Sequence, residues 1–318
     1  MRTLMAMDDE EVDMEQVVVG FDGSRQALEA LRWAAREAER RGWDVLVVQS
    51  WRERLVGERP IIEIWQDPEA GLRAVQAALD DAVDTVAQDH PAVRFSSLVV
   101  GERADRALVE LSAEAPMVVV GARGRGGFSS LLLGSVSQHV ASRASCTVVV
   151  VRTGTVGDGD VVVGVDGSDA SRRALSWAAE AARQSQRRLK VVLAWSYLLP
   201  ESEHGLEPFR ASYTAADARR ALETIVKEVL GSDPGLEVEL EATCDLAARA
   251  LIERGGDAAL LVVGPEKSPS RAWLDLGSVT LQVLHHVSCP LAIVRSVQDR
   301  SGTDPEASDV SEASTGGR

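Results

Sequence analysis

The chain has 318 residues, of which 45% are hydrophobic and 26% charged, a balance that predicts globular domains with buried cores. Its 49 acidic and 34 basic residues give a formal net charge of −15, which argues against nucleic acid and against a membrane surface as partners. Three cysteines without paired spacing predict a reducing, cytoplasmic location, and no apolar run is long enough to span a bilayer. The first residues are acidic and rich in methionine, without the apolar core of a secretory signal.

Residues 16–21 form a continuous β-branched run, which is typical of a strand buried on both faces of a parallel sheet. Ser24 is the expected N-cap of a helix over 25–41, and Gly42 is expected to end that helix. An irregular stretch containing Pro60 and Trp65 is expected later in this unit. Strands and helices are predicted to alternate through the rest of the unit: strand 44–51, helix 68–89, strand 93–100, helix 104–115, strand 117–121, helix 134–144 and strand 146–151.

The chain repeats this unit. Val17–Ser24 recurs as Val161–Ser168, and Gly134–Val136 recurs as Gly277–Val279. The fold predicted is therefore α/β, with two tandem, doubly wound, Rossmann-like units that each contain a five-stranded parallel sheet. The predicted division is an acidic tail over 1–15, a first domain over 16–153, a second domain over 160–296 and a disordered tail over 297–318.

Repeated tryptophans and cysteines are interpreted as packing positions. Trp33 recurs as Trp177, and Cys146 recurs as Cys289. His285 and His286 stand near the end of a predicted helix, where a charged imidazole would complement the helix dipole.

A glycine-rich loop joins a buried strand to a helix in the first unit. It reads Gly121-Ala122-Arg123-Gly124, then nine residues, then Gly134-Ser135-Val136. Glycines admit an anion close to the backbone, and the helix N-terminus adds unpaired N–H donors. Three plainer interpretations remain open: the loop is a simple strand-to-helix turn, Asp22 only caps the next helix, and the loop arginines Arg123 and Arg125 are solvated charges.

This spacing resembles the ATP-binding motif of the universal stress protein family, and the strand that ends in Asp-Gly-Ser resembles that family too. The resemblance covers both units. It implies that the triphosphate is held by Gly121, Gly124, Gly134, Ser135 and Val136, with Val120 and Arg123 beside them. It also implies that Gly20, Phe21 and Asp22 meet the adenosine end, that Ser50 meets the adenine, and that Mg²⁺ accompanies ATP.

The second unit departs from the motif. Asp166, Gly264, Gly277 and Ser278 are retained as candidate nucleotide-binding residues. Lys267 stands where Gly124 is expected, Pro265 removes a backbone donor, and Glu266 adds negative charge where phosphate oxygens would lie. The sequence therefore predicts a competent site in the first unit and a degraded one in the second.

The function predicted is an ATP-binding regulatory stress-response protein with an unidentified protein partner and, at most, weak incidental ATPase activity. One alternative is a nucleotide-independent scaffold with vestigial sites. The other is an adenylating enzyme, which is disfavoured because the first strand leads into Phe-Asp-Gly-Ser and not into a Ser-Gly-Gly or His-x-Gly-His motif. By resemblance, residues 146–151 and 289–294 are expected to pair antiparallel in an internal pseudo-dimer, and the sequence leaves open whether two chains form a homodimer.

Overall fold

The computed structural model describes residues 15–51, 55–56, 59–60, 68–124, 132–152, 158–195, 214–232, 235–265 and 276–295. The predicted C-terminal tail and residues 1–14 of the predicted N-terminal tail lie outside these ranges, as do Arg125, Glu266 and Lys267.

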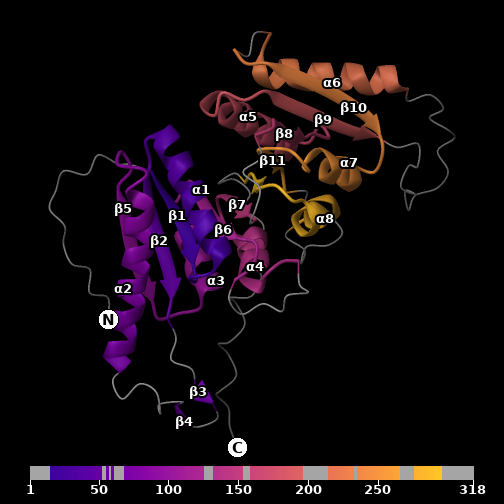
Figure 1. Cartoon of the computed structure of the whole chain (residues 1–318). Coiled ribbons are helices and arrows are strands. Elements are labelled where there is room, and N and C mark those ends of the chain that lie inside the picture. Colours follow the sequence, from indigo (N-terminus) through magenta and orange to yellow (C-terminus); the bar gives the residue numbers. More distant parts are fainter. Residues whose placement is uncertain are drawn as a thin grey trace, which may run out of the picture.

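The elements follow the predicted alternation, with bounds within a few residues of those expected (Figure 1). The first unit contains β1 (Gln16–Phe21), α1 (Arg25–Arg41), β2 (Asp44–Ser50), α2 (Pro68–Ala87), β5 (Phe95–Val100), α3 (Ala104–Leu111), β6 (Met117–Gly121), α4 (Ser135–Arg143) and β7 (Thr147–Val151). The second contains β8 (Val161–Gly164), α5 (Asp169–Gln184), β9 (Leu189–Trp195), α6 (Ala215–Leu230), β10 (Val238–Cys244), α7 (Ala247–Arg254), β11 (Leu260–Val263), α8 (Ser278–His286) and β12 (Leu291–Ile293). The stretch predicted to be irregular also holds a short antiparallel pair, β3 (Leu55–Val56) with β4 (Arg59–Pro60).

Local signals fix the ends of the first helix as expected. The Ser24 hydroxyl accepts a hydrogen bond from the amide of Ala27 at 3.1 Å. At the other end, Gly42 adopts φ 68°, the left-handed conformation that glycine tolerates best, and its amide bonds to the carbonyl of Ala38. Both predicted caps are confirmed.

The described strands of the two units form one ten-stranded sheet in the order β10-β9-β8-β11-β12-β7-β6-β1-β2-β5. Within each unit, neighbouring strands of this sheet are all parallel, which confirms the predicted fold class. The units join where β7 and β12 pair antiparallel, with Val150 opposite Leu291 and Val148 opposite Ile293. The predicted pairing of the two final strands is therefore confirmed. Every residue of β7 is buried, because this strand has neighbours on both edges and helices on both faces.

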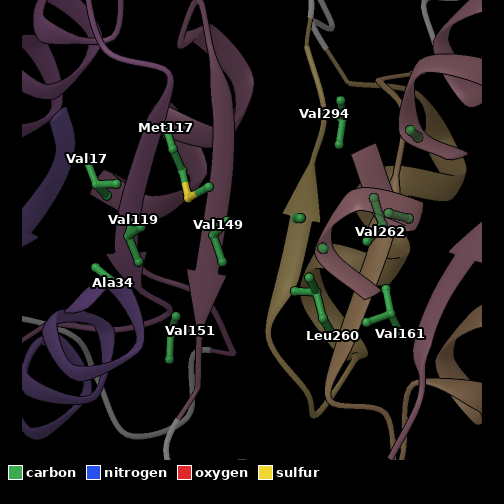
Figure 2. Close-up of a cluster of buried hydrophobic side chains, with 14 of the residues drawn as sticks. Val17, Ala34, Met117, Val119, Val149, Val151, Val161, Leu260, Val262 and Val294 are labelled. Carbon is green, nitrogen blue, oxygen red and sulfur yellow. The ribbon is translucent and has the colours of Figure 1, made fainter. Parts of the chain in front are cut away.

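Alternate residues of each strand contribute to one of two cores. Val17 and Val19 of β1 face the layer of α1, α2, α5 and α6, whereas Val18 faces the layer of α3, α4, α7 and α8. Figure 2 shows the first of these cores, with Val149 in the first unit and Val294 in the second. This core is continuous across the junction of the units.

The repeated packing residues lie where they were expected. Trp33 and Trp177 pack against the first core, and Cys146 and Cys289 are buried. Arg41, at the end of α1, stacks on the ring of Trp177 in the other unit at 5.2 Å from the ring centroid. No helix in the described part of the chain is both long and apolar enough to cross a membrane.

Candidate nucleotide site

A cavity of about 410 Å³ opens in the first unit where the strand order reverses. The chain runs outward from β1 through β2 to β5, and then returns to the other side of β1 with β6. At such a switch point the loops after neighbouring strands diverge, which leaves a crevice at the carboxyl edge of the sheet. Ten of the eleven predicted first-unit residues line this cavity: Gly20, Phe21, Asp22, Val120, Gly121, Arg123, Gly124, Gly134, Ser135 and Val136.

Ser50 is the predicted residue that the cavity does not include. Its hydroxyl donates a hydrogen bond to the carbonyl of Glu102, which ties the end of β2 to the loop before α3. The wall on this side is instead apolar and is formed by Val48, Ala104 and Leu108. Period-2 alternation in β2 could have identified Val48, but nothing local in the sequence marks the two residues of α3.

The N-terminus of α4 presents backbone donors to the cavity. Its N-cap, Gly134, supplies no side-chain acceptor, and the first backbone bond of the helix runs from the amide of Gln138 to the carbonyl of Gly134. The amides of Ser135, Val136 and Ser137 therefore precede the first intrahelical bond. By contrast, a serine hydroxyl caps the start of α1. Together with the helix dipole, the first turn of α4 favours an anion.

The Gly134 amide is bonded within the loop, since it donates to the carbonyl of Ala122 at 2.8 Å. The amide of Arg123 donates to the side-chain oxygen of Gln26, and the hydroxyl of Ser137 donates to the carbonyl of Gly121 at 2.7 Å. The bonds of Gly134 and Ser137 join the two ends of the loop, and the bond of Arg123 ties the loop to α1. Sequence reasoning missed Gln26 and Ser137. The available signal for Ser137 was that a hydroxyl residue, Thr280, stands at the equivalent position of the second unit. The hydroxyl of Thr280 donates to the carbonyl of Gly264 in the same way, at 3.0 Å.

Gly121 allows two backbones to approach each other. A Cβ at this position would lie 2.8 Å from the carbonyl carbon of Gln26 and 3.0 Å from the amide nitrogen of Ala27. Gly264 is equally close to the backbone of Ala170 in the second unit, at 2.8 Å. The first glycine of the motif is therefore required in both units for packing the helix after the first strand onto the sheet.

Gly124 makes room for a side chain. A Cβ there would lie 2.3 Å from the Oδ2 atom of Asp22, while the Oδ1 atom of Asp22 accepts a hydrogen bond from the amide of Ser24 at 3.0 Å. Asp22 thus contributes to the turn before α1 and also lines the cavity. The structural and the ligand-binding interpretations of Asp22 are compatible.

The equivalent cavity of the second unit is smaller, at about 180 Å³. Asp166 and Gly264 line it, but Gly277 and Ser278 are not among its lining residues. Burial by itself would raise the pKa of Asp166, yet hydrogen bonds from the hydroxyl and amide of Ser168 and from the hydroxyl of Ser171 leave that pKa lower than usual. This carboxylate therefore stays ionised at neutral pH.

The chemistry of the first cavity is compatible with a nucleotide that brings its own cation. Asp22 is the carboxylate among the described lining residues, and Arg123 is the cation. No cluster of three or more metal-binding side chains exists within the described ranges. Mg²⁺ in nucleotide sites is commonly held by one or two carboxylates together with phosphate and water, so these residues suit a phosphate-bound ion better than a cage built from protein alone.

The fold and the cavities define a class: a duplicated, doubly wound α/β protein with a crevice at the switch point of each unit. The chain belongs to the universal stress protein family, whose sequence profile matches residues 14–152 and 159–295. It is 32% identical over 292 residues to Universal stress protein Rv2005c of Mycobacterium tuberculosis, covering 88% of this chain and 96% of that protein. It is 30% identical over 304 residues to Universal stress protein Rv2623 of the same organism, with the same coverage.

A solved structure has the same architecture over both units. The crystal structure of a universal stress protein from Archaeoglobus fulgidus superimposes with a TM-score of 0.62 and 18% sequence identity, covering 90% of this chain and 98% of that one. At this identity the likeness concerns the fold.

Proposed function

We propose that this protein binds ATP in its first unit as a regulatory ligand and that its second unit binds ATP weakly or not at all. Ten residues of the resembled motif and its adenosine-binding end meet in one cavity, and this convergence is the observation that carries the proposal. The apolar wall of Val48, Ala104 and Leu108 suits the flat face of a base, and the first turn of α4 suits the phosphates.

The difference between the units supports the proposed asymmetry. A cavity of about 410 Å³ falls within the ~300–1,000 Å³ typical of small-molecule sites, whereas one of about 180 Å³ falls below it. The serine that follows the N-cap glycine lines the first cavity, but its counterpart Ser278 does not line the second.

A binding role is favoured over catalysis by the groups that line the first cavity. The described lining includes one carboxylate, Asp22, and no histidine or lysine. A general base for hydrolysis must approach the attacking water, and Asp22 is already engaged by the amide of Ser24. We therefore assign ATP the role of a ligand whose occupancy stabilises one arrangement of the loop before α4.

A pair of matched variants tests both parts of the proposal by calorimetric titration of the full chain with ATP and Mg²⁺. Ser135→Ala removes a hydroxyl that lines the first cavity, and Ser278→Ala removes its counterpart in the second unit. Both serines are exposed at the first position of a nine-residue helix, so the two changes are comparable in their effect on folding.

We expect one ATP per chain in the unaltered protein. Loss of one hydrogen bond to a charged group is worth about 1.5–3 kcal/mol, so Ser135→Ala should weaken ATP binding by roughly 10- to 150-fold. Ser278→Ala should leave the affinity unchanged. The absence of binding heat, with no nucleotide released from the denatured protein in mass spectrometry, would support the nucleotide-independent scaffold. Two nucleotides per chain, or equal weakening by both variants, would contradict the asymmetry.

A further inference from the structure

Two arginines reach across the junction between the units. Arg152 follows β7, and its Nη2 atom donates to the carbonyl of Leu284 in α8 at 2.5 Å. Arg295 follows β12, and its Nη2 atom donates to the carbonyls of Ala141 and Ser142 in α4 at 2.6 and 2.8 Å. Arg152 and Arg295 occupy equivalent positions in the repeat, so each unit caps the last helix of the other with the same residue.

The antiparallel pairing of β7 and β12 creates this exchange. The end of each final strand emerges beside the start of the other, which is where the preceding helix of the other unit terminates. Carbonyls in the last turn of a helix have no intrahelical partner, and Leu284 is fully buried, so its carbonyl would be costly to leave unpaired. A guanidinium supplies both the donors and the positive charge that a helix C-terminus favours.

The sequence suggested that a charged imidazole near the end of α8 complements the helix dipole, and for His285 this interpretation needs correction. Burial, the neighbouring His286 and then Arg152 lower the pKa of His285, so its neutral form is favoured at pH 7. Arg152 supplies a cation at this helix end.

Arg152 makes a second bond that leads to the nucleotide cavity. Its Nη1 atom donates to the carbonyl of Leu132 at 3.1 Å, and Leu132 lies two residues before the N-cap of α4. A single guanidinium thus joins the chain entering Gly134 in the first unit to the end of α8 in the second. The opposite end of α8 lines the second cavity through Val279 and Thr280. The nine residues of α8 span about 13 Å as a single helix.

We propose that Arg152 is a positioning residue that couples the first cavity to helix α8 and, through α8, to the second cavity. This inference rests on the proposed binding of ATP in the first unit. Phosphates seated on the first turn of α4 would fix the chain at Leu132, and that carbonyl would in turn fix one arm of the guanidinium. The other arm holds α8, so nucleotide binding in the first unit stabilises the C-terminus of α8.

The negative charge of a bound triphosphate would also favour the position that Arg152 occupies between the units. Burial, followed by the positive charge of Arg123, lowers the pKa of Arg152, so the two cations repel each other. Arg123 lines the first cavity, and a triphosphate beside it would offset this repulsion. Because coupling between two sites is reciprocal, a ligand that stabilises α8 from the second cavity would also raise the affinity of the first.

Hydrogen exchange of the full-length protein, with and without ATP and Mg²⁺, tests the coupling. In the unaltered protein we expect ATP to slow exchange both in residues 133–138 and in residues 278–287, by roughly fivefold or more in the latter. In Arg152→Gln, ATP should still slow exchange in residues 133–138 but should no longer slow exchange in residues 278–287. Arg295→Gln is the matched control, since it removes the equivalent cap from α4 and leaves the bonds of Arg152 in place; the response of α8 should survive in it.

Two further variants keep the test decisive. Arg152→Lys retains the charge but lacks the planar fork that reaches two carbonyls, so it should lose the α8 response even if Arg152→Gln folds poorly. Gly124→Val places side-chain atoms where the Oδ2 atom of Asp22 lies, and it should abolish both responses. Protection of α8 that persists in Gly124→Val would come from nucleotide in the second cavity and would overturn the inference.

The remaining outcomes separate the two proposals. ATP protection of 133–138 without protection of α8, or an α8 response that is unchanged in Arg152→Gln, would overturn the coupling and leave the proposed function intact. Absence of ATP protection at 133–138 would overturn the proposed function and the coupling together.

Discussion

Replacing Gly121 by alanine tests whether the first glycine of the motif serves the fold or the ligand. The new Cβ would lie 2.8, 2.9 and 3.0 Å from backbone atoms of Gln26 and Ala27, whereas ordinary carbon contacts are about 3.5–4.0 Å. Backbone atoms in a capped helix cannot rotate away, so the start of α1 must move by about 0.5–1 Å. Overpacking of this kind costs about 1–3 kcal/mol, and we expect the upper end.

Gly124→Ala is the comparison, because its Cβ would meet a side-chain atom of Asp22. Rotation of that carboxylate relieves the contact and loses its hydrogen bond to Ser24, a cost of about 1 kcal/mol. We therefore expect Gly121→Ala to destabilise the protein by about 2 kcal/mol more than Gly124→Ala, while both weaken ATP binding. Gly264→Ala should match Gly121→Ala, since its Cβ would lie 2.8 Å from the backbone of Ala170.

Thermal unfolding measured by calorimetry and circular dichroism gives the comparison. At about 2–4 °C per kcal/mol for units of this size, Gly121→Ala should melt roughly 4–8 °C below Gly124→Ala. Equal melting temperatures, or a lower one for Gly124→Ala, would refute the assignment of Gly121 to packing. Unchanged ATP affinity in Gly124→Ala would refute the placement of the nucleotide against Asp22.

Two further predictions concern titratable groups outside the cavities. Hydrogen bonds from Arg103 lower the pKa of Asp105 from 3.8 to about 2. A carboxyl group whose pKa is lower in the folded state than in the unfolded state stabilises the protein above about pH 4. That stabilisation is lost as the pH falls toward 2. Asp105→Asn should therefore lower the free energy of unfolding by about 1 kcal/mol at pH 7, a modest loss because the exposure of Arg103 weakens the ion pair. In denaturant titrations this loss should shrink toward zero near pH 2. A loss that is independent of pH would contradict the assignment. Burial raises the pKa of Cys289 to about 12, so iodoacetamide at pH 8 should label Cys244, which is exposed, and spare Cys289 until the protein unfolds. Labelling of Cys289 in the native protein, detected by peptide mass spectrometry, would show that the strand β12 opens readily.

Much of the fold follows from local sequence signals. The caps at Ser24 and Gly42 were predictable because each involves residues within four positions of one another. The strands were predictable because continuous β-branched runs suit a sheet covered on both faces. The repeat then required a second unit of the same fold, and the family resemblance implied that the final strands of the two units would pair.

The candidate site was predictable in outline for a related reason. Phosphate-binding loops need glycines at fixed spacing, so the residues that meet at the cavity are marked in the sequence. Which atom each glycine accommodates was not marked: Gly121 accommodates the backbone of Gln26, and Gly124 accommodates the carboxylate of Asp22. These contacts join residues about a hundred positions apart in the sequence. A neighbouring helix, a carboxylate or a phosphate would each require a glycine at such a position, so the residue type alone does not identify the neighbour.

The sequence by itself determined the elements, the duplication and the family motif, because each is written in residue type and spacing. Tertiary structure alone decided that Ser50 bonds Glu102 instead of lining the cavity, and that Arg152 joins Leu132 to Leu284. The acceptors in these bonds are backbone carbonyls, which every residue carries and which therefore leave no trace in the sequence. The packing of one unit against the other brings the carbonyl of Leu284 within reach of Arg152.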